Sequence, residues 1–356
     1  MTLSGWLMHK DAAIAKIDNF EITDVADVRL LPLYLKRGGA LKAWVEDRVI
    51  DRHRPHSRLI RRMLRMSAAE DYEISLKVNA ATITDNWWIK KDSEDISYTD
   101  VRFSVNYFDN LALLGDPDSI ERINRAALLG SRSPELTNIG SFEKCWRLEE
   151  GAWWLYKQSN ELQTFSELFI FEMGRLMGFN MAIFEPWAQG TKTLDFTGQG
   201  KYDFEPAFAL VGEEIDYLIN YKAIAGLSLE MARAYLDILA CDALFFNFDR
   251  HTHNYGFLRD SVTGEYIAMA PNFDNNLALA ANGYPSEALT ARKNDIFIND
   301  FLDLLESIDV RYKLPELQEA DMERVMDKIG MDVNRQRIKD FVLAGYTRLR
   351  ESEYIL

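Results

Sequence analysis

The sequence predicts an α+β protein, in which a β-rich part precedes a large helical part and a mixed α/β module comes before both. Three observations lead to this prediction. Strand-type aromatic and apolar residues flank a glycine turn within 141–158, as in a β-hairpin. The run 229–246 is hydrophobic on nearly every face, which is typical of a buried helix. Amphipathic helical periodicity then continues through 299–308, 316–329 and 335–352.

The composition indicates a globular protein of two or three domains, with 356 residues of which 47% are hydrophobic. A net charge of −15 argues against direct nucleic-acid binding, because phosphates are repelled on average. The two cysteines, Cys145 and Cys241, have no metal or redox spacing and fit a reducing compartment. No apolar run approaches the ~20 residues of a membrane span, and residues 1–14 lack the order of a signal peptide. We therefore expect a cytoplasmic protein without membrane contact.

Residues 1–130 alternate short strand-like and helix-like segments. The stretches 6–8 and 13–17 carry strand-type residues, whereas 41–50 and 57–66 have apolar residues at helical spacing. The aromatic residues further along this region have no basic residues interleaved with them, so we expect a role in the core rather than as a platform for stacked bases. They are Trp87, Trp88, Phe103, Tyr107 and Phe108.

A basic segment, residues 48–65, stands out in this acidic chain. Its arginines are Arg48, Arg52, Arg54, Arg58, Arg61, Arg62 and Arg65, with His53 and His56 between them. We favour a solvated helix face with acidic neighbours. The alternative is a docking patch for an acidic partner or for nucleic acid.

The stretch 131–140 has the Ser, Pro, Asn and Gly content of an exposed loop, and it leads into the hairpin. Lys157 lies in the second strand of that hairpin. A glycine turn between strands with a lysine in the second strand can cover and neutralise phosphates. The alternative is a plain hairpin with an exposed lysine.

A helix over 165–178 follows, with Ser166 as its expected N-cap and Gly178 at its end. Glu167 would lie in its first turn and position Lys157, although acids are common there for dipole reasons alone. Two strands, 180–188 and 190–196, come next. We expect the backbone of Asp195 and Phe196 at their end to meet an adenine edge.

The stretch 246–276 carries the residues for phosphoryl transfer. Ser228 caps the apolar helix that delivers Asp249, and Asn254 follows at the spacing of a protein-kinase catalytic loop. Asp274 lies just beyond a run, 266–270, that reads as a buried strand. One carboxylate would orient an attacking hydroxyl, and an amide oxygen and a second carboxylate would hold magnesium. The alternative is that all three are turn formers and caps.

The ordered motifs TNIGSFEK, WWLYK, FSELF, DRHTHN and NFDNN, from residue 131 to about 350, resemble those of the HipA-like serine/threonine kinases, which are toxin-type bacterial kinases. The resemblance implies a bilobal protein-kinase-like fold. Residues 1–130 would be an N-terminal accessory module, 131–200 the small lobe with a phosphate loop, and 201–356 the helical large lobe. Residues 281–297 would correspond to an activation segment.

The resemblance also implies ATP and Mg²⁺ as cofactors. Asp249 would be the catalytic residue, Asn254 and Asp274 would hold the metal, and Arg250 and His251 would brace their loop. The remaining residues expected around the nucleotide are Ile139, Gly140, Ser141, Phe142, Lys144, Lys157, Glu167, Asp195, Phe196, His251 and His253. Thr137 falls where family members carry an autophosphorylated serine, and Ser141 is a second hydroxyl nearby.

Family members phosphorylate a serine or threonine of a protein, in known cases an aminoacyl-tRNA synthetase, and are often restrained by a small helix-turn-helix antitoxin. A translation factor or synthetase as substrate and such an antitoxin as partner are therefore what the resemblance implies. Three alternatives remain: a pseudokinase or interaction scaffold, a small-molecule phosphotransferase on the same fold, and a zinc hydrolase. The hydrolase would use Asp249, His251, His253 and Asp274.

Overall fold

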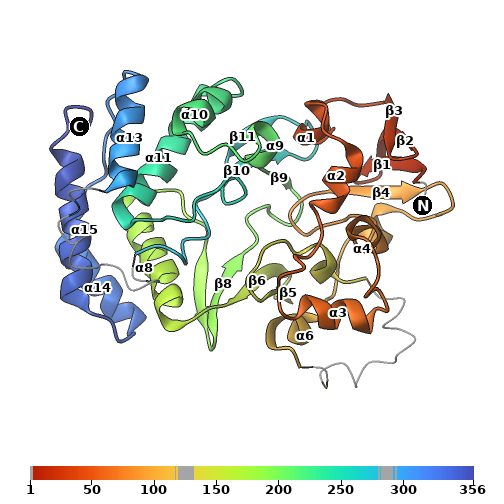
Figure 1. Cartoon of the computed structure of the whole chain (residues 1–356), viewed down its shortest axis with the longest axis horizontal. Helices are drawn as coiled ribbons and strands as arrows, with labels where there is room; N and C mark the ends of the chain where they lie inside the picture. The colour runs from red at the N-terminus through yellow and green to blue at the C-terminus, as the bar shows by residue number, and fades with distance from the viewer. Residues whose placement is uncertain (1–2, 117, 119–131, 280, 282–291, 293–294) are drawn as a thin grey trace. The chain divides into compact units, whose positions relative to one another are not determined.

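The computed structural model describes residues 3–116, 118, 132–279, 281, 292 and 295–356 (Figure 1). The chain forms two compact units. The N-terminal unit contains Met1–Gln158, Lys192–Glu205 and Leu258–Ile267, and the C-terminal unit contains Ser159–Thr191, Pro206–Phe257 and Ala268–Leu356. The hairpin thus groups with the N-terminal residues, and the domain boundaries at 130 and 200 stay a prediction.

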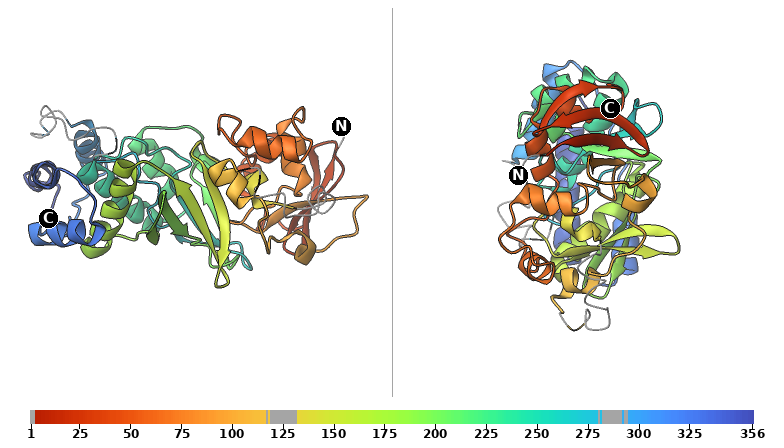
Figure 2. Two further views of the ribbon diagram at one scale, coloured as in Figure 1. Left: turned by 90° about the horizontal axis from the view of Figure 1, so that it is seen from below. Right: turned by 90° about the vertical axis from the view of Figure 1, so that its right-hand side faces the viewer.

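A four-stranded sheet with the order β3-β2-β1-β4 begins the N-terminal unit. Strand β1 pairs antiparallel with β2 on one side and with β4 on the other. Figure 2 shows the red strands beside the red-orange helices that follow them in the chain. Apolar residues of β1 and β2, among them Leu7 and Ile14, form one core with residues of helices α1, α2 and α4, such as Leu35 and Trp44. The strands are β1 (Gly5–His9), β2 (Ala12–Asp18), β3 (Glu21–Val25) and β4 (Trp87–Lys91).

The other elements of this unit are short helices and the expected hairpin. The hairpin strands β5 and β6 pair antiparallel with Lys144 opposite Lys157. These elements are α1 (Leu33–Lys36), α2 (Leu41–Glu46), α3 (Ser57–Met63), α4 (Asp71–Lys77), α5 (Tyr98–Val101), α6 (Asp109–Leu114), the 3₁₀ helix η2 (Pro134–Thr137), β5 (Lys144–Glu149) and β6 (Ala152–Gln158).

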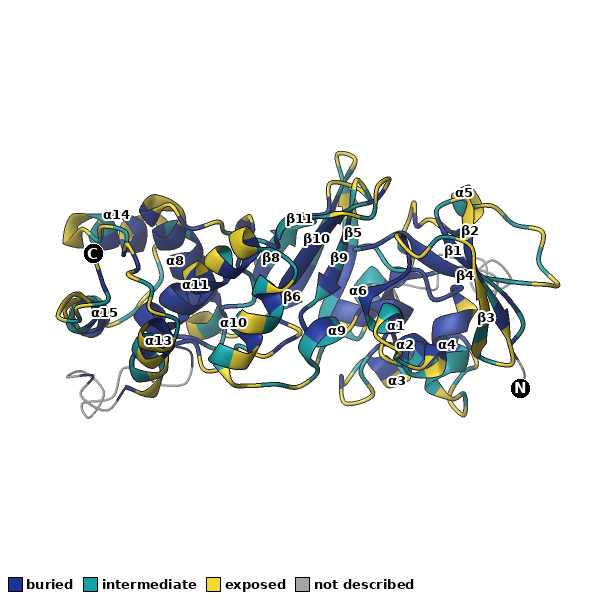
Figure 3. Ribbon diagram, turned by 90° about the horizontal axis from the view of Figure 1, so that it is seen from above, coloured by how far each residue is buried: buried dark blue, intermediate teal, exposed yellow. Residues whose placement is uncertain are grey.

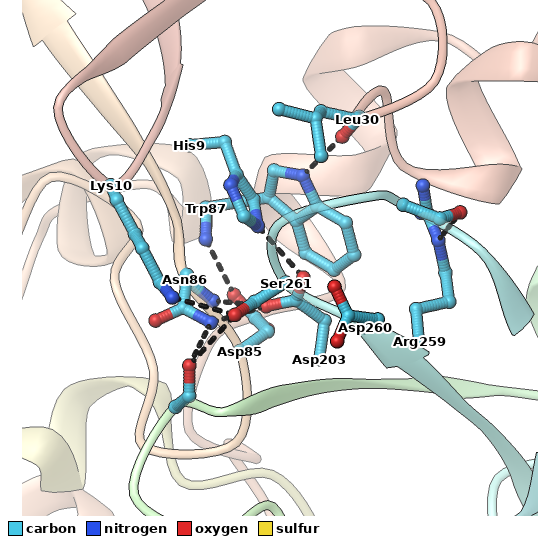
Figure 4. Close-up of polar contacts among 12 residues, drawn as sticks. His9, Lys10, Leu30, Asp85, Asn86, Trp87, Asp203, Arg259, Asp260 and Ser261 are labelled. Carbon is cyan, nitrogen blue, oxygen red and sulfur yellow. Dashed lines mark hydrogen bonds and ion pairs between the residues drawn. The ribbon is translucent and has the colours of Figure 1, made fainter. Parts of the chain in front are cut away.

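Buried polar contacts join the first residues of the unit to its later segments (Figure 4). The Nε2 atom of His9 lies 2.7 Å from Oδ2 of Asp203, and both side chains are almost fully buried. The backbone N–H of Asn86 donates to Oδ1 of the same aspartate at 2.8 Å. Lys10 donates to the hydroxyl of Ser261 at 2.6 Å. The three parts of the sequence therefore fold as one unit.

The C-terminal unit is mainly helical. Its long helix α11 is buried along most of its length, as Figure 3 shows, because apolar residues occupy nearly every face. Ser228 caps this helix as predicted, since its hydroxyl accepts from the N–H of Met231. The elements are α8 (Glu161–Met177), β7 (Phe184–Trp187), α9 (Phe208–Val211), α10 (Tyr217–Ala225), α11 (Leu229–Phe245), α13 (Ile296–Ser307), α14 (Glu319–Ile329) and α15 (Arg335–Arg350).

The chain passes from one unit to the other at five points, of which one directly follows β6 and four lie within further strands. Their sheets have the orders β5-β6-β8-β7 and β11-β10-β9. The sequence analysis missed β9 and β10, and the predicted burial of 266–270 was wrong at Ile267, which is 43% exposed. These strands are β8 (Gly190–Leu194), β9 (Tyr202–Pro206), β10 (Gly256–Asp260) and β11 (Tyr266–Met269).

Four further local predictions were wrong. Tyr107 is not a core residue, because it is 43% exposed. Helix α8 begins after Asn160 rather than at Ser166, so Glu167 is not in its first turn. Most of 131–140 is not an exposed loop, because residues 133–138 are buried and Glu135 accepts the N–H of Trp146 at 2.7 Å. The basic segment is not a wholly solvated face either. Its Arg48, Arg54 and Arg61 are buried, and each guanidinium donates to a carboxylate and to backbone carbonyls. The partners are Asp85 and Ala80 for Arg48, Glu135, Asn138 and Lys144 for Arg54, and Asp71 and Ile50 for Arg61.

Most of the segment 281–297 lies outside the described residues, so the activation segment stays a prediction. Among the described helices, none is both long enough and apolar enough to cross a membrane.

Replacing Asn160 by alanine tests where helix α8 begins. The side chain of Asn160 accepts from the N–H of Gln163 at 2.9 Å, and the side chain of Gln163 accepts from the N–H of Asn160 at 3.1 Å. We expect Asn160→Ala to lower the free energy of unfolding by about 1 kcal/mol in urea denaturation. Ser166→Ala is the control, because the buried hydroxyl of Ser166 has no hydrogen-bond partner in the described part of the chain, and we expect a change within about 0.5 kcal/mol. The reverse order of effects would place the N-cap at Ser166.

Candidate functional site

The loop that carries Asp249 and Asn254 is held by its own side chains. Phe246 ends helix α11 in the left-handed conformation, with φ of 56°, and turns the chain. The N–H of Asp249 then donates to Oδ1 of Asn247 at 3.1 Å. The side-chain amide of Asn254 donates to the carbonyl of Asp249 at 3.0 Å. These contacts fix the two predicted site residues relative to each other.

Arg250 joins this loop to the segment that carries Asp274. Its Nη1 donates to the carbonyls of Asn254 and Phe273, each at 2.7 Å. Its Nη2 donates to Oδ1 of Asn272 at 2.8 Å and of Asn275 at 2.9 Å. The predicted bracing role of Arg250 is therefore confirmed, and the guanidinium brings Asn254 and the neighbours of Asp274 together.

A buried carboxylate anchors this guanidinium. Asp242, from the last turns of α11, accepts from Nε of Arg250 at 2.8 Å and from Nη2 at 2.9 Å. The two side chains are only 3% and 1% exposed. Burial lowers the pKa of Arg250, but the Asp242 carboxylate outweighs it, so the pKa is raised and the guanidinium stays charged.

The Asp274 segment is also held by helix α8. Asp274 has a φ of 62°, a left-handed conformation that needs support in a non-glycine residue. The next N–H, of Asn275, donates to Oε1 of Glu167 at 2.7 Å. Glu167 is fully buried, so this contact is shielded from water. In the described structure, Glu167 thus supports the backbone beside Asp274. Its predicted pairing with Lys157, which belongs to the other unit, stays a prediction.

The donor set of Asn254 and Asp274 suits Mg²⁺. This ion prefers oxygen ligands and is usually held by one or two protein groups, with water and phosphate completing the shell. The amide nitrogen of Asn254 is used by the carbonyl of Asp249, which leaves its amide oxygen as the atom for a cation. Asp274 supplies a carboxylate on the segment that Arg250 holds beside it.

The two histidines of the loop lie next to each other. The ring of His253 stacks on Phe208 with centroids 4.4 Å apart, and its centroid is 5.8 Å from that of His251. Desolvation at this position and the neighbouring His251 lower the pKa of His253, which favours a neutral ring. His251 Nδ1 accepts the N–H of His253 at 3.3 Å, so His251 does brace the loop.

The predicted phosphate loop was 139–144. In the N-terminal unit, residues 139–143, called the phosphate loop below, join η2 to strand β5, and Lys144 is the first residue of that strand. Gly140 has a φ of 107°, and a Cβ atom there would lie 2.3 Å from Nζ of Lys144. Nζ of Lys157 lies 4.5 Å from the ring centroid of Phe142. Lys144 and Lys157 are direct cross-strand partners, an arrangement of like charges that costs stability on its own. Two ammonium groups beside a glycine loop are suited to an anionic ligand.

The two candidate hydroxyls in this region differ in exposure. Thr137 is buried in η2, and its hydroxyl donates to the carbonyl of Ala81 at 2.6 Å. Ser141 is exposed, as is Ile139. In this conformation Ser141 is the accessible hydroxyl.

Asp195 and Phe196 follow strand β8 in the N-terminal unit. The N–H of Asp195 donates to the carbonyl of Trp153 at 2.9 Å, so this backbone donor is already used. Burial raises the pKa of the Asp195 carboxyl, which accepts from the N–H of Thr197 at 3.0 Å. Phe196 packs edge-on against Phe204 at 5.4 Å. Their role at an adenine stays a prediction.

The zinc alternative has no support in the described residues. Among them, no three His, Cys, Asp or Glu side chains are gathered as a metal site. His253 instead packs on an aromatic ring.

Solved structures are similar to this chain, although no protein-family model and no curated protein matches it. One is HipA of Shewanella oneidensis MR-1, solved as a toxin–antitoxin complex with HipB and its operator DNA. It matches over 97% of this chain and 96% of its own, with 12% identity and a TM-score of 0.55. The chain has the HipA-like kinase fold. The predicted α+β, kinase-like fold class is thereby confirmed.

A second similar structure is the proinflammatory kinase CtkA of Helicobacter pylori. It matches over 58% of this chain and 94% of its own, with 17% identity and a TM-score of 0.44.

The sequence analysis missed four side chains that support the candidate site. They are Asp242, Asn247, Asn272 and Asn275. The signal for Asp242 was an acid within the otherwise apolar last part of α11, residues 238–245, because such a residue needs a buried partner. The asparagines lie within the motifs already singled out.

Replacing Arg250 by methionine tests the buried pair. The change leaves Asp242 buried without its cation, and we expect the free energy of unfolding to fall by about 3–5 kcal/mol in urea denaturation. The double variant Arg250→Met with Asp242→Leu should recover much of this loss, because both charges are then absent. A loss below about 1 kcal/mol in the single variant would mean that the pair behaves like one at the surface.

Replacing Phe208 by alanine tests the environment of His253. The change removes the stacked ring that desolvates one face of the imidazole, so the pKa of His253 should rise toward the ordinary value of about 6.5, as followed by NMR titration of the ring. In the wild type, His253 of the unfolded chain takes up its proton near pH 6.5, whereas the folded chain takes it up only at lower pH. The lowered pKa therefore decreases the free energy of unfolding as the pH falls below about 6.5. That pH dependence should weaken in Phe208→Ala. Phe204→Ala, in the other unit, should leave the pKa of His253 where it is; equal shifts in both variants would contradict the assignment.

Proposed function

We propose that the protein is an ATP- and Mg²⁺-dependent serine/threonine protein kinase of the HipA-like type. The observation that carries the proposal is the Arg250 network, in which one guanidinium contacts the loop of Asp249 and Asn254 and the segment of Asp274. Phosphoryl transfer needs little covalent chemistry from a protein, because positioning and charge stabilisation supply most of the catalysis. A rigid set of one orienting carboxylate and two metal-binding oxygens meets that need.

Each residue has a role in this proposal. Asp249 orients the substrate hydroxyl and accepts its proton, while Asn254 and Asp274 hold Mg²⁺. The bound ion would neutralise charge on the triphosphate. The phosphate loop, Lys144 and Lys157 bind phosphate oxygens, and Lys157 pairs with Glu167. Asp195 and Phe196 lie at the adenine, and the neutral His253 lies near the phosphates.

The phosphate loop is also a proposed target of the kinase itself. A phosphate there would add about two negative charges beside the two lysines. Ser141 is exposed, so its hydroxyl is accessible in this conformation. Thr137 is buried and would have to leave its contact with Ala81 first. We therefore place autophosphorylation at Ser141 before Thr137.

The proposed binding partners rest on similarity to a solved protein, and no residue of this chain identifies them. HipA of Shewanella oneidensis was solved with HipB and operator DNA. We propose a small helix-turn-helix antitoxin as a partner here, and a translation factor or aminoacyl-tRNA synthetase as the substrate.

Label transfer from γ-labelled ATP tests the proposed function. With Mg²⁺, we expect label on the protein itself or on a protein of a bacterial lysate, and we expect Asp249→Ala to reduce its rate about 10²–10⁴-fold. Asp303→Ala is the matched control, since Asp303 is an exposed aspartate of α13 in the same unit and should leave the rate unchanged. Mapping the label would separate Ser141 from Thr137.

Three outcomes would count against this proposal. Label that persists in Asp249→Ala would remove Asp249 from its role. ATP binding without any transfer would favour a pseudokinase. Transfer only to a small molecule would favour a phosphotransferase of another substrate class.

A further inference from the structure

Arg54, from the basic segment, contacts the chain on both sides of the phosphate loop. Its Nη1 donates to the carbonyl of Asn138 at 3.0 Å, immediately before the loop. Its Nη2 donates to the carbonyl of Lys144, immediately after the loop. One side chain thereby sets the separation of the two loop ends.

The same stretch of chain also holds the loop by a residue within it. The carboxylate of Glu143 accepts the N–H of His56 at 2.9 Å and lies 3.1 Å from the Nδ1 atom of that ring. It lies 3.5 Å from Nε of Arg54. In addition, the N–H of Ile50 donates to the carbonyl of Leu136 at 2.9 Å. Residues 50–56 are therefore attached before, within and after the loop.

The chemistry of this position calls for arginine. Arg54 is fully buried, and Nη2 lies 3.3 Å from Oε2 of the equally buried Glu135. Burial raises the pKa of Glu135, and the guanidinium opposes that rise. A planar fork can bind two carbonyls and a carboxylate at once, whereas a lysine ammonium is a point charge with a flexible stem. A lysine would keep the charge and lose the fixed geometry.

We propose that Arg54 is a positioning residue for nucleotide binding, which holds the phosphate loop in the conformation that meets the triphosphate. The inference rests on the proposed function, because the triphosphate is the ligand assigned to this loop there. The N-terminal residues are then part of the nucleotide site rather than an accessory module. A loop held in advance does not have to be ordered when ATP binds, so the contact improves ATP affinity without touching ATP.

The test compares Arg54→Lys with Arg259→Lys. Arg259 is the matched control, because it is also buried in the N-terminal unit and binds backbone carbonyls and a buried carboxylate, but none of residues 134–144 (Figure 4). Its partners are the carbonyls of Arg29, Leu31 and Gly264 and the carboxylate of Glu205.

Two readouts separate positioning from general destabilisation. Without nucleotide, hydrogen exchange in a peptide covering 138–144 should become about tenfold faster in Arg54→Lys and stay at the wild-type rate in Arg259→Lys. With ATP, KM should rise about tenfold in Arg54→Lys with kcat changed less than about threefold, while Arg259→Lys keeps the wild-type KM.

A second variant tests the proposal independently, in case Arg54→Lys does not fold. Glu143→Gln removes the charge that binds the loop to His56 and Arg54, but leaves the buried pair of Arg54 and Glu135 intact. It should raise exchange and KM in the same direction, by about threefold. Wild-type exchange of the loop in both variants, or an equal rise of KM in Arg259→Lys, would overturn the proposal. If the wild type transfers no label from ATP, the proposed function fails, and the exchange experiment still decides whether Arg54 holds the loop.

Discussion

The buried ion pair of Arg250 and Asp242 is the interaction on which the candidate site depends. Taking two charges out of water costs several kcal/mol per ion, so such a pair is retained only where further hydrogen bonds satisfy the remaining donors. Here those bonds come from Asn254, Phe273, Asn272 and Asn275. Neither the loop nor the Asp274 segment can move without leaving a guanidinium donor buried and unsatisfied. The buried pair therefore costs desolvation free energy, and it fixes the Asp249–Asn254 loop relative to the Asp274 segment.

The N-terminal unit uses the same device at the phosphate loop. Arg54 is buried, donates to the carboxylate of Glu135, and also donates to backbone carbonyls at the two ends of the loop. In both places a guanidinium sets the backbone that presents the functional groups, instead of meeting a ligand itself. The lysines that would meet the ligand, Lys144 and Lys157, lie on paired strands, whose register fixes their spacing.

Local patterns predicted what depends on near neighbours in sequence. Strands β1 and β2, the β5–β6 hairpin, the Ser228 cap and the loop with Asp249 and Asn254 all have short-range signals. The start of α8 also had one, because Asn160 with Gln163 forms a capping box that the sequence analysis overlooked in favour of Ser166. The burial of 133–138 had none. Its Ser, Pro and Asn content is typical of a loop, and the partners that bury it, such as Arg54 and Ala81, come from far away in the sequence.

The site was predictable for a similar reason. Asp249, Arg250, Asn254 and Asp274 lie in two compact motifs, so their residue types and spacing carry the chemistry. The supporting Asp242 and Glu167 lie in helices, where a single acid has several explanations, and only tertiary contacts decide among them.

A paramagnetic cation would test most directly whether Asn254 and Asp274 share a metal. Mn²⁺ can replace Mg²⁺ at oxygen ligands, and it broadens the NMR signals of nuclei close to it. With a non-hydrolysable ATP analogue and Mn²⁺ at low stoichiometry, we predict that the side-chain amide of Asn254 and the backbone amides of Asp274 and Asn275 broaden together. Asp274→Asn should weaken the broadening at Asn254 as well. Broadening at one of the two residues alone, or unchanged broadening of Asn254 in Asp274→Asn, would contradict a shared ion.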